Sequence, residues 1–273
     1  MDNTRTYNTW HQFVRAADNI NDLNPNRRHS RDKSKPIWSG TDSFEETIHL
    51  ASRGWPEGLK KVRNSIQIIE RFISQRQPRK ELAYGVRGPG ILDLERYQQG
   101  RPDSWLGWEE HHTQEGMSTQ IVPIVFNLSA SGGVNASVLF NRGAAVCALI
   151  DTLEHHNIRV ELTLAEKAQY YPDRRGEPSS DYTWKVLMKH SEDVLDMDRI
   201  AFALCNASVL RRLMFSLAEQ HVKHLPVGYG SPLSHKEPGA INIDAASLYI
   251  RNESDMVPWL VTQLAGYGIE VQD

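Results

Sequence analysis

The stretch "IVPIVFNLSASGGVNASVLFNRGAAVCALIDTLEHHNIRVELTL", residues 121–164, decides the fold. It begins with a continuous apolar run, which is typical of a strand covered on both faces. From about Ser137 to His156 the apolar side chains follow helical spacing, and "IRVELTL" is again typical of a strand. A strand, a helix and a strand in this order predict two parallel strands joined by a crossover helix.

Strands and helices continue to alternate after this stretch. "YTWKVLMKH" and "AINID" are predicted strands, and helices are predicted at about 196–205, at about 208–220 and in "DMVPWLVTQLAGYG". Such alternation predicts an α/β domain with a doubly wound, mostly parallel sheet over residues 117–273. Residues 1–116 are rich in tryptophan and in turn signals, and we expect a smaller, mainly helical N-terminal region there.

The clearest local signal of this N-terminal region is "TDSFEETIHLASRGWPEG", residues 41–58. Ser43 and Glu46 have the spacing of a capping box, which satisfies free amide groups at the start of a helix. Gly54 suits the left-handed position that follows a helix. A second amphipathic helix at about 57–76 then predicts a helical hairpin with a basic outer face.

Composition excludes several classes of protein. The chain has 273 residues, a formal net charge of −3, and 40% hydrophobic and 24% charged residues. These values are typical of a soluble globular protein, and the charge argues against a dominant nucleic-acid surface. We find no apolar run near the roughly 18 residues of a membrane span and no secretory signal, so we expect no membrane partner. Cys147 and Cys205 lie in apolar helical patterns, and we expect two reduced thiols in a cytoplasmic protein.

Two polar groups follow predicted strands at the carboxyl edge of the sheet, where ligands bind in such folds. Asn127, Ser129 and Ser131 belong to the loop "NLSAS", and Asp244 ends the strand "AINID". We therefore expect both groups to face one crevice. The loop residues also suit a simple turn, because Asn and Ser hydrogen-bond to nearby backbone and the two following glycines let the chain reverse.

The arrangement of residues 118–273 resembles a von Willebrand factor A-type domain. In that family the first strand ends in an Asp-x-Ser-x-Ser motif that holds a divalent cation, and a later strand supplies another acid. The resemblance implies Mg²⁺ as the possible cofactor, with Ser129, Ser131 and Asp244 as its ligands. Asn127 stands where the family has Asp, so this loop offers a hard cation one charge less.

A second resemblance spans more of the chain. The segments "SFEET", "VFNLSAS" and "MDRIAFAL" resemble an uncharacterised protein family that is carried by bacteriophages and plasmids. This resemblance implies a setting in the host cytoplasm, and it implies no activity.

Three hypotheses on function follow. The first is a non-enzymatic module that binds another macromolecule, a protein partner, at the crevice between the NLSAS loop and Asp244. The second is a nucleic-acid-binding accessory protein in phage or plasmid replication or transcription, with tryptophans that stack on unpaired bases. Its candidate basic residues are Arg27, Arg28, Arg31, Lys33, Lys35, Lys60 and Lys61. The third is a metal-dependent hydrolase, for which we find neither a base nor a full set of ligands, and the oligomeric state stays open.

Overall fold

The protein is described here from a computed structural model. The described residues are 3–19, 29–32, 35–70, 79–85, 90–111, 120–171, 178–222, 225, 228–244, 250, 253–267 and 269. The chain divides into two compact units, of which unit 1 comprises Met1–Ile73 and Thr119–Asp273, and unit 2 comprises Ser74–Ser118. Each unit is described by itself.

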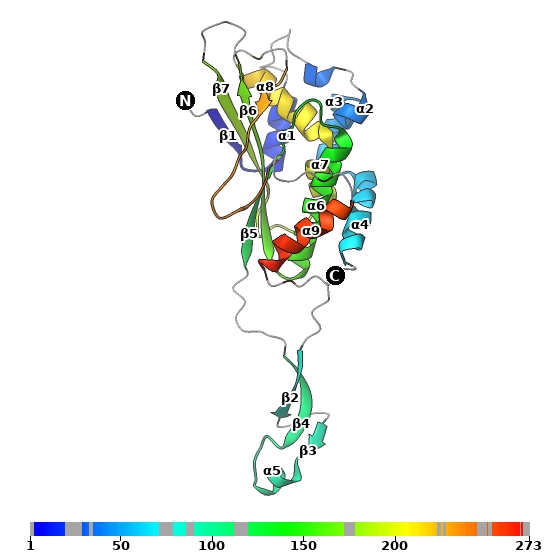
Figure 1. Ribbon diagram of the computed structural model, residues 1–273, viewed down its shortest axis with the longest axis vertical. Helices are drawn as coiled ribbons and strands as arrows, with labels where there is room; N and C mark the ends of the chain where they lie inside the picture. Colours follow the sequence, from blue (N-terminus) through cyan, green and yellow to red (C-terminus); the bar gives the residue numbers. More distant parts are fainter. Residues whose placement is uncertain are drawn as a thin grey trace. The chain divides into compact units, whose positions relative to one another are not determined.

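A six-stranded mixed sheet forms the centre of unit 1 (Figure 1). Its strands are, in spatial order, β1 (Asn3–Tyr7), β7 (Ser180–Lys189), β6 (Arg159–Tyr170), β5 (Ile121–Asn127) and β9 (Ile241–Ile243), while β8 (Ser231–Pro232) also pairs with β6. The pairs β1–β7, β5–β6 and β5–β9 are parallel, whereas β6–β7 and β6–β8 are antiparallel. The predicted α/β class with a mostly parallel sheet is therefore confirmed at this coarse level.

Strand β6 continues well past the end of β5. Asn127, the last residue of β5, pairs with Ala165, and β6 runs on to Tyr170. The sequence predicts this strand only as far as Leu164, because the charged residues that follow interrupt its apolar run. Buried residues alternate along the strand through this extension, so Glu166 lies on the same face as the apolar core.

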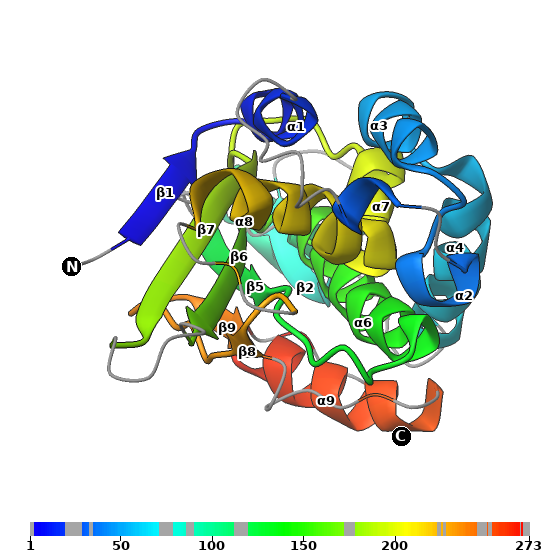
Figure 2. The same cartoon turned by 90° about the horizontal axis from the view of Figure 1, so that it is seen from above.

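The described helices of unit 1 gather on one face of the sheet (Figure 2). They are α1 (Trp10–Asp18), η1 (His29–Arg31), α2 (Pro36–Ser39), α3 (Phe44–Arg53), α4 (Pro56–Glu70), α6 (Ala136–His155), α7 (Met197–Cys205), the π-helix η2 (Val209–Met214), α8 (Phe215–His221) and α9 (Glu253–Ala265). On the other face, Glu237 of the segment after β8 forms an ion pair with Lys185 of β7. This arrangement differs from the predicted doubly wound sheet, which would carry helices on both faces.

The N-terminal residues belong to unit 1 rather than to a separate region. β1 extends the sheet beside β7, and α3 and α4 pack against α7. The structure therefore differs from the predicted boundary between residues 116 and 117. The predicted helix start is confirmed, because the Ser43 hydroxyl accepts a hydrogen bond from the Glu46 amide at 3.0 Å. Gly54 ends the helix with a φ of 88°, which favours glycine, but its ψ of 178° differs from the expected left-handed helical conformation.

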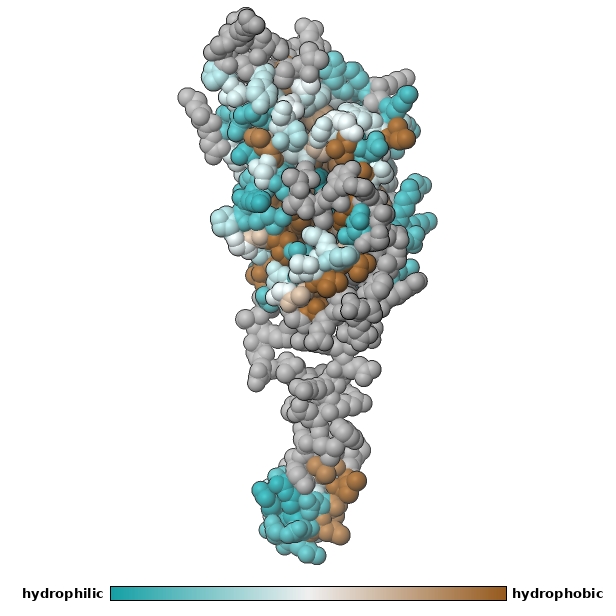
Figure 3. Space-filling view, in the orientation of Figure 1, coloured by the Kyte–Doolittle hydropathy of each residue, from teal (hydrophilic) through white to brown (hydrophobic). Residues whose placement is uncertain are grey.

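Unit 2 is a small antiparallel sheet with one short helix. Its strands β2 (Arg79–Gly85), β4 (Trp105–His111) and β3 (Gly90–Leu92) lie in this order, and α5 (Leu94–Gln98) follows β3. The side chain of Asp93 caps α5 by accepting hydrogen bonds from two backbone amides. Ile91, Leu94 and Tyr97 are exposed, and Figure 3 shows an apolar and a polar side on the described part of this unit.

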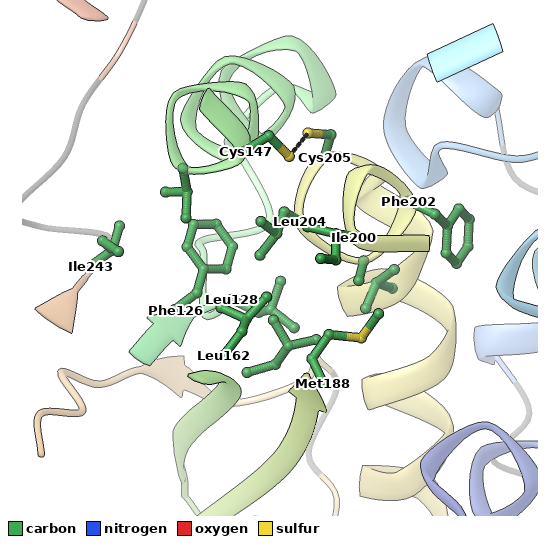
Figure 4. Close-up of a cluster of buried hydrophobic side chains, with 14 of the residues drawn as sticks. Phe126, Leu128, Cys147, Leu162, Met188, Ile200, Phe202, Leu204, Cys205 and Ile243 are labelled. Atoms are coloured by element: carbon green, nitrogen blue, oxygen red, sulfur yellow. Dashed lines mark hydrogen bonds between the residues drawn. The ribbon is translucent and has the colours of Figure 1, made fainter. Parts of the chain in front are cut away.

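The core of unit 1 lies between the sheet and helices α6 and α7 (Figure 4). Gly143 allows α6 to approach α7 closely, since it has no side chain. A Cβ atom at this position would lie only 2.2 Å from the carbonyl oxygen of Leu204. Cys147 and Cys205 face each other across this contact with their sulfur atoms 3.9 Å apart, which is far beyond the length of a disulfide bond. Burial raises the pKa of the Cys205 thiol.

Helix α6 is long and apolar enough to cross a membrane, with a mean hydropathy of 1.3 in its most apolar window, which the sequence analysis did not anticipate. However, 67% of that window is buried inside unit 1. The bent pair formed by α7 and Val209–His221 passes the same test of length and composition. The apolar side chains of α6 therefore serve the core.

Candidate functional site

Asn127 occupies the end of β5 and is held by three hydrogen bonds. Its Oδ1 accepts from the amide of Ser129 at 3.1 Å, while its Nδ2 donates to the carbonyl oxygen of Leu233 at 2.9 Å and to Oδ1 of Asp244 at 2.7 Å. These partners fix the orientation of the side-chain amide, since exchanging its oxygen and nitrogen would lose all three bonds. Asn127 and Asp244 therefore meet where neighbouring strands β5 and β9 end, as their positions in the sequence suggested.

Ser129 is engaged by the backbone of β6. Its hydroxyl accepts from the amide of Lys167 at 2.8 Å and donates to the carbonyl oxygen of the same residue at 2.9 Å. Asn127, Ser129 and Asp244, which we call the strand-end cluster, are all buried. Ser131 lies apart from them on the exposed part of the loop, where its carbonyl oxygen accepts from the amide of Val134.

A buried arginine supplies positive charge to the strand-end cluster. Arg142 of α6 donates to the carbonyl oxygen of Leu128 at 3.3 Å, and its guanidinium lies 5.0 Å from the ring centroid of Phe126. Burial lowers the pKa of Arg142 to about 10, and the negative charge of Asp244 opposes this shift. The guanidinium of Arg142 thus stabilises the carboxylate of Asp244, which the sequence suggested as a metal ligand.

The strand-end cluster does not fit a Mg²⁺ ion. Such an ion prefers oxygen ligands, but Asn127 turns its N–H groups toward Asp244, and the Ser129 hydroxyl is bound to backbone. Arg142 adds a positive charge that would repel a cation. Among the described residues, no group of three or more His, Cys, Asp or Glu side chains could hold a metal ion.

A pocket of about 390 Å³ opens beside the loop at this edge of the sheet. We call it the strand-end pocket, and its lining includes Trp38, Gly132, Glu166, Ala168, Phe215 and Tyr229. Glu166 and Ala168 come from the part of β6 that extends past β5, so the pocket lies beyond the carboxyl end of β5. Ligands bind in this position in many α/β sheets.

Glu166 is the one carboxylate in the described lining of the pocket, and it is 4% exposed. Burial raises its pKa to about 8, and no charged side chain of the described residues contributes to the shift. Its Oε2 has no hydrogen-bond partner in the described part of the chain. The same is true of Nε1 of Trp184, its partner on β7, so these two atoms do not bond to each other.

Glu166 is a functional candidate that the sequence patterns did not identify, although they contain a signal for it. In "RVELTLAEKAQY" the residues at even positions from Val160 to Tyr170 are apolar except Glu166. A single acid in the apolar register of a strand indicates a buried carboxyl group. The predicted strand ends at Leu164, before this residue, so the alternation of apolar residues in β6 was not extended to Glu166.

Two buried arginines of η2 position the mouth of the pocket. Arg211 donates to the carbonyl oxygens of Trp38 and Val134, and its guanidinium lies 4.5 Å from the ring centroid of Trp38. Arg212 donates to Thr41 Oγ1 at 3.0 Å and to the carbonyl oxygens of Thr41 and Ser30. Nε1 of Trp38 also donates to the carbonyl oxygen of Gly132 at 3.0 Å. Together these bonds fix α2 to the loop that follows β5.

The candidate nucleic-acid residues do not form one described surface. Arg27, Arg28 and Lys33 lie outside the described residues. Arg31 is engaged internally, since it donates to the carbonyl oxygens of Ala17 and Asp18 and lies over the ring of Phe44. Lys35, Lys60 and Lys61 are exposed.

The tryptophans expected to stack on bases likewise do not form one surface. Trp10 is buried and donates to the carbonyl oxygen of Ala51 at 2.7 Å, and Trp55 packs edge-on against Phe140 and Phe202. Both therefore serve the core of unit 1. Trp38 is partly exposed at the mouth of the pocket.

Comparison with known proteins gives a match to one family model, described as "Domain of unknown function (DUF7192)", over residues 2–269. The match passes through the boundary that the sequence predicted near residue 116 and spans both units. No curated protein and no solved structure matches the chain.

Proposed function

The chain belongs to the family described as a domain of unknown function (DUF7192), and we propose that it is a non-enzymatic protein that binds a protein partner around the strand-end pocket. The contact surface, which we call the rim, consists of Ile37 and Trp38 of α2 and residues 131–133 of the loop. The observation that carries the proposal is the side chain of Ile37, which is 80% exposed on a helix that internal bonds hold in place.

A rigidly held apolar side chain suits the centre of a protein interface. Exposed apolar residues that stand beside a preformed pocket bind a partner with little loss of conformational freedom. Arg211 fixes the carbonyl group of the neighbouring Trp38, and Trp38 is bonded to Gly132 of the loop. The rim is therefore ordered before a partner arrives.

The chemistry of the pocket lining favours binding over catalysis. Of its described lining residues, Glu166 and Tyr229 carry ionisable groups, and the Tyr229 hydroxyl is bonded to Glu219. A nucleophile with a neighbouring base, which covalent catalysis requires, is not found among these lining residues.

The likeness to von Willebrand factor A-type domains is part of this proposal. The bond between Asn127 and Asp244, at the ends of neighbouring parallel strands, supports such an arrangement of the loop. The setting that the second resemblance implies, a phage- or plasmid-borne protein in the host cytoplasm, belongs to the same proposal.

The proposal is tested by capture of a partner with matched variants. Ile37→Asp places a charge on the rim, and Val194→Asp makes the same change at an aliphatic side chain that is 87% exposed. Val194 follows the end of β7, and the last residue of β7 pairs near the beginning of β6. Val194 therefore lies at the end of the sheet opposite to the strand-end pocket. We expect a host protein that the natural chain and Val194→Asp retain equally and that Ile37→Asp loses. Equal retention by both variants, or no retained protein, would refute the rim as the contact surface.

DNA is the alternative partner, because Lys60 and Lys61 are exposed on α4. A mobility shift with single-stranded or duplex DNA at low salt, where phosphate contacts are strongest, would favour it. Loss of that shift in a Lys60→Glu, Lys61→Glu variant would show that the partner is a nucleic acid rather than a protein.

A further inference from the structure

The strand-end pocket has the size and lining of a small-molecule site. Its volume of about 390 Å³ falls within the range of roughly 300–1,000 Å³ that is common for ligand pockets. Trp38, Phe215 and Tyr229 contribute aromatic side chains, and Ala168 and Gly132 leave space between them. Such a lining favours a flat apolar group.

Phe215 and Tyr229 form an aromatic wall of the pocket, and this wall is preformed. The rings of Phe215 and Tyr229 stack with centroids 3.6 Å apart and an angle of 4° between their planes. The Tyr229 hydroxyl donates to Glu219, which is itself bonded to the amide and hydroxyl of Ser30. The polar end of Tyr229 is therefore occupied inside the protein.

Within the described part of the chain, Glu166 has neither a counter-ion nor a hydrogen bond at Oε2. The cause of its raised pKa is burial alone, and no positive side chain of the described residues offsets its charge. Oε2 lacks a described partner, although buried polar atoms in folded proteins are nearly always bonded. A ligand in the pocket with a positively charged N–H donor would supply the missing counter-ion beside this carboxyl group.

We infer that the strand-end pocket binds a small organic cation, with a flat apolar body between the aromatic side chains and an amidine, guanidine or amine group that pairs with the carboxyl group of Glu166. The cation is either a free molecule or the basic side chain of a protein partner. The inference concerns the chemistry of the pocket and stands independently of the rim as a protein-binding surface.

The test uses two probes of similar size and opposite charge. Benzamidine carries a cationic amidine on a flat ring, and benzoate carries a carboxylate on the same ring. Calorimetric titration of the full chain at pH 9, where the carboxyl group of Glu166 is ionised, should detect benzamidine binding at millimolar concentration and no benzoate binding. Equal binding of both probes, or no binding of benzamidine, would overturn the inference.

Matched variants locate the bound probe. Glu166→Gln should weaken benzamidine binding by about tenfold or more, because a hydrogen bond between charged groups is lost. Glu161→Gln makes the same change earlier on β6, on the opposite face of the strand, and should leave the affinity unchanged. Equal affinities of the two variants would show that Glu166 does not hold the cation.

A second pair of variants separates loss of charge from loss of space. Gly132 lines the pocket and Gly133 does not, and a Cβ atom on either would meet open space. Gly132→Leu should weaken benzamidine binding at least as much as Glu166→Gln, whereas Gly133→Leu should not. If both bind as the natural chain does, the probe occupies another place and the inference fails.

The source of the natural cation follows from the capture experiment. If a retained host protein is lost with Glu166→Gln but kept with Glu161→Gln, its own basic side chain enters the pocket. If capture is unchanged while benzamidine affinity falls, the natural ligand is a free molecule. Both outcomes support the cation, and failure of capture alone contradicts only the proposed rim.

Discussion

The strand-end cluster and the base of the strand-end pocket lie at the same edge of the sheet, and both bury polar side chains. In the cluster the polar atoms pair within the protein, because Asn127 bonds Asp244 and Ser129 bonds the backbone of Lys167. At the pocket, Oε2 of Glu166 has no described partner. The difference teaches that a position at a strand end does not by itself leave a polar group without a partner. Substitutions in the two places should therefore have opposite effects on stability.

The largest expected effect is that of Asp244→Ala. The change leaves the N–H group of Asn127 without its acceptor and the buried guanidinium of Arg142 without the negative charge of Asp244, and it should lower the free energy of unfolding by about 3–5 kcal/mol. Denaturant unfolding followed by circular dichroism measures it. Asp244→Asn retains an acceptor oxygen without the charge and should cost less. A loss below about 1 kcal/mol for Asp244→Ala would show that the cluster is not internally bound.

Asn127→Asp should have the next largest effect. It puts a second carboxylate 2.7 Å from Asp244 and removes the donor to Leu233, and we expect a loss of about 2–4 kcal/mol in the free energy of unfolding. Millimolar Mg²⁺ should raise the midpoint of thermal unfolding of neither the variant nor the natural chain. A rise in the variant alone would mean that one missing charge is all that separates this loop from a cation site.

Glu166→Gln should stabilise the protein, by an amount that depends on pH. The pKa of Glu166 is about 8 in the folded chain against 4.5 for the free side chain, so between these values the folded chain holds a proton that the unfolded chain has released. The natural protein must then lose stability as pH rises from about 4.5 to about 8, and the uncharged glutamine must not.

At pH 9 the variant should exceed the natural chain by about 1–3 kcal/mol, and at pH 4 the two should be nearly equal. Thermal unfolding at a series of pH values measures the difference. Tyr170 and Tyr229, whose pKa values burial also raises, titrate in both proteins and cancel in the comparison. A difference that does not change with pH would mean that Glu166 is not held in its neutral form.

The smallest expected effect is that of Ser129→Ala. It removes the hydroxyl that bonds both the amide and the carbonyl group of Lys167, and it should cost about 1 kcal/mol. Ser131→Ala is the matched control on the exposed part of the same loop and should cost close to nothing. Equal costs would contradict the division between the buried cluster and the exposed loop.

Local signals in the sequence predicted local structure well. The capping pair Ser43 and Glu46 and the terminating Gly54 mark α3 as expected, because these interactions involve residues within one turn of the helix. The apolar run of β5 and the helical pattern of α6 likewise correspond to the structure. The contact of Asn127 with Asp244 followed from the rule that parallel strands end at one edge.

Long-range pairing was beyond the sequence patterns. β1 is a polar edge strand with no apolar alternation, and only its partner β7 makes it a strand. The apolar run predicts β6 only as far as Leu164, and Glu166 lies beyond that limit. The burial of the cluster depends on Lys167, Leu233 and Arg142, none of which the loop sequence indicates. Whether the cluster, the rim or the basic residues take part in binding stays a prediction.

The pairing of β1 with β7 also has a consequence for synthesis of the chain on the ribosome. Asn3 pairs with Tyr182, so β1 waits for β7, the fourth of the six described strands of its sheet in chain order. At about 5–20 residues per second this delay is on the order of 10–35 s. A polar strand tolerates that wait in water better than an apolar one, because an exposed apolar edge would pair with other nascent chains. The same polarity that hid β1 from sequence patterns thus protects the unfinished protein from aggregation.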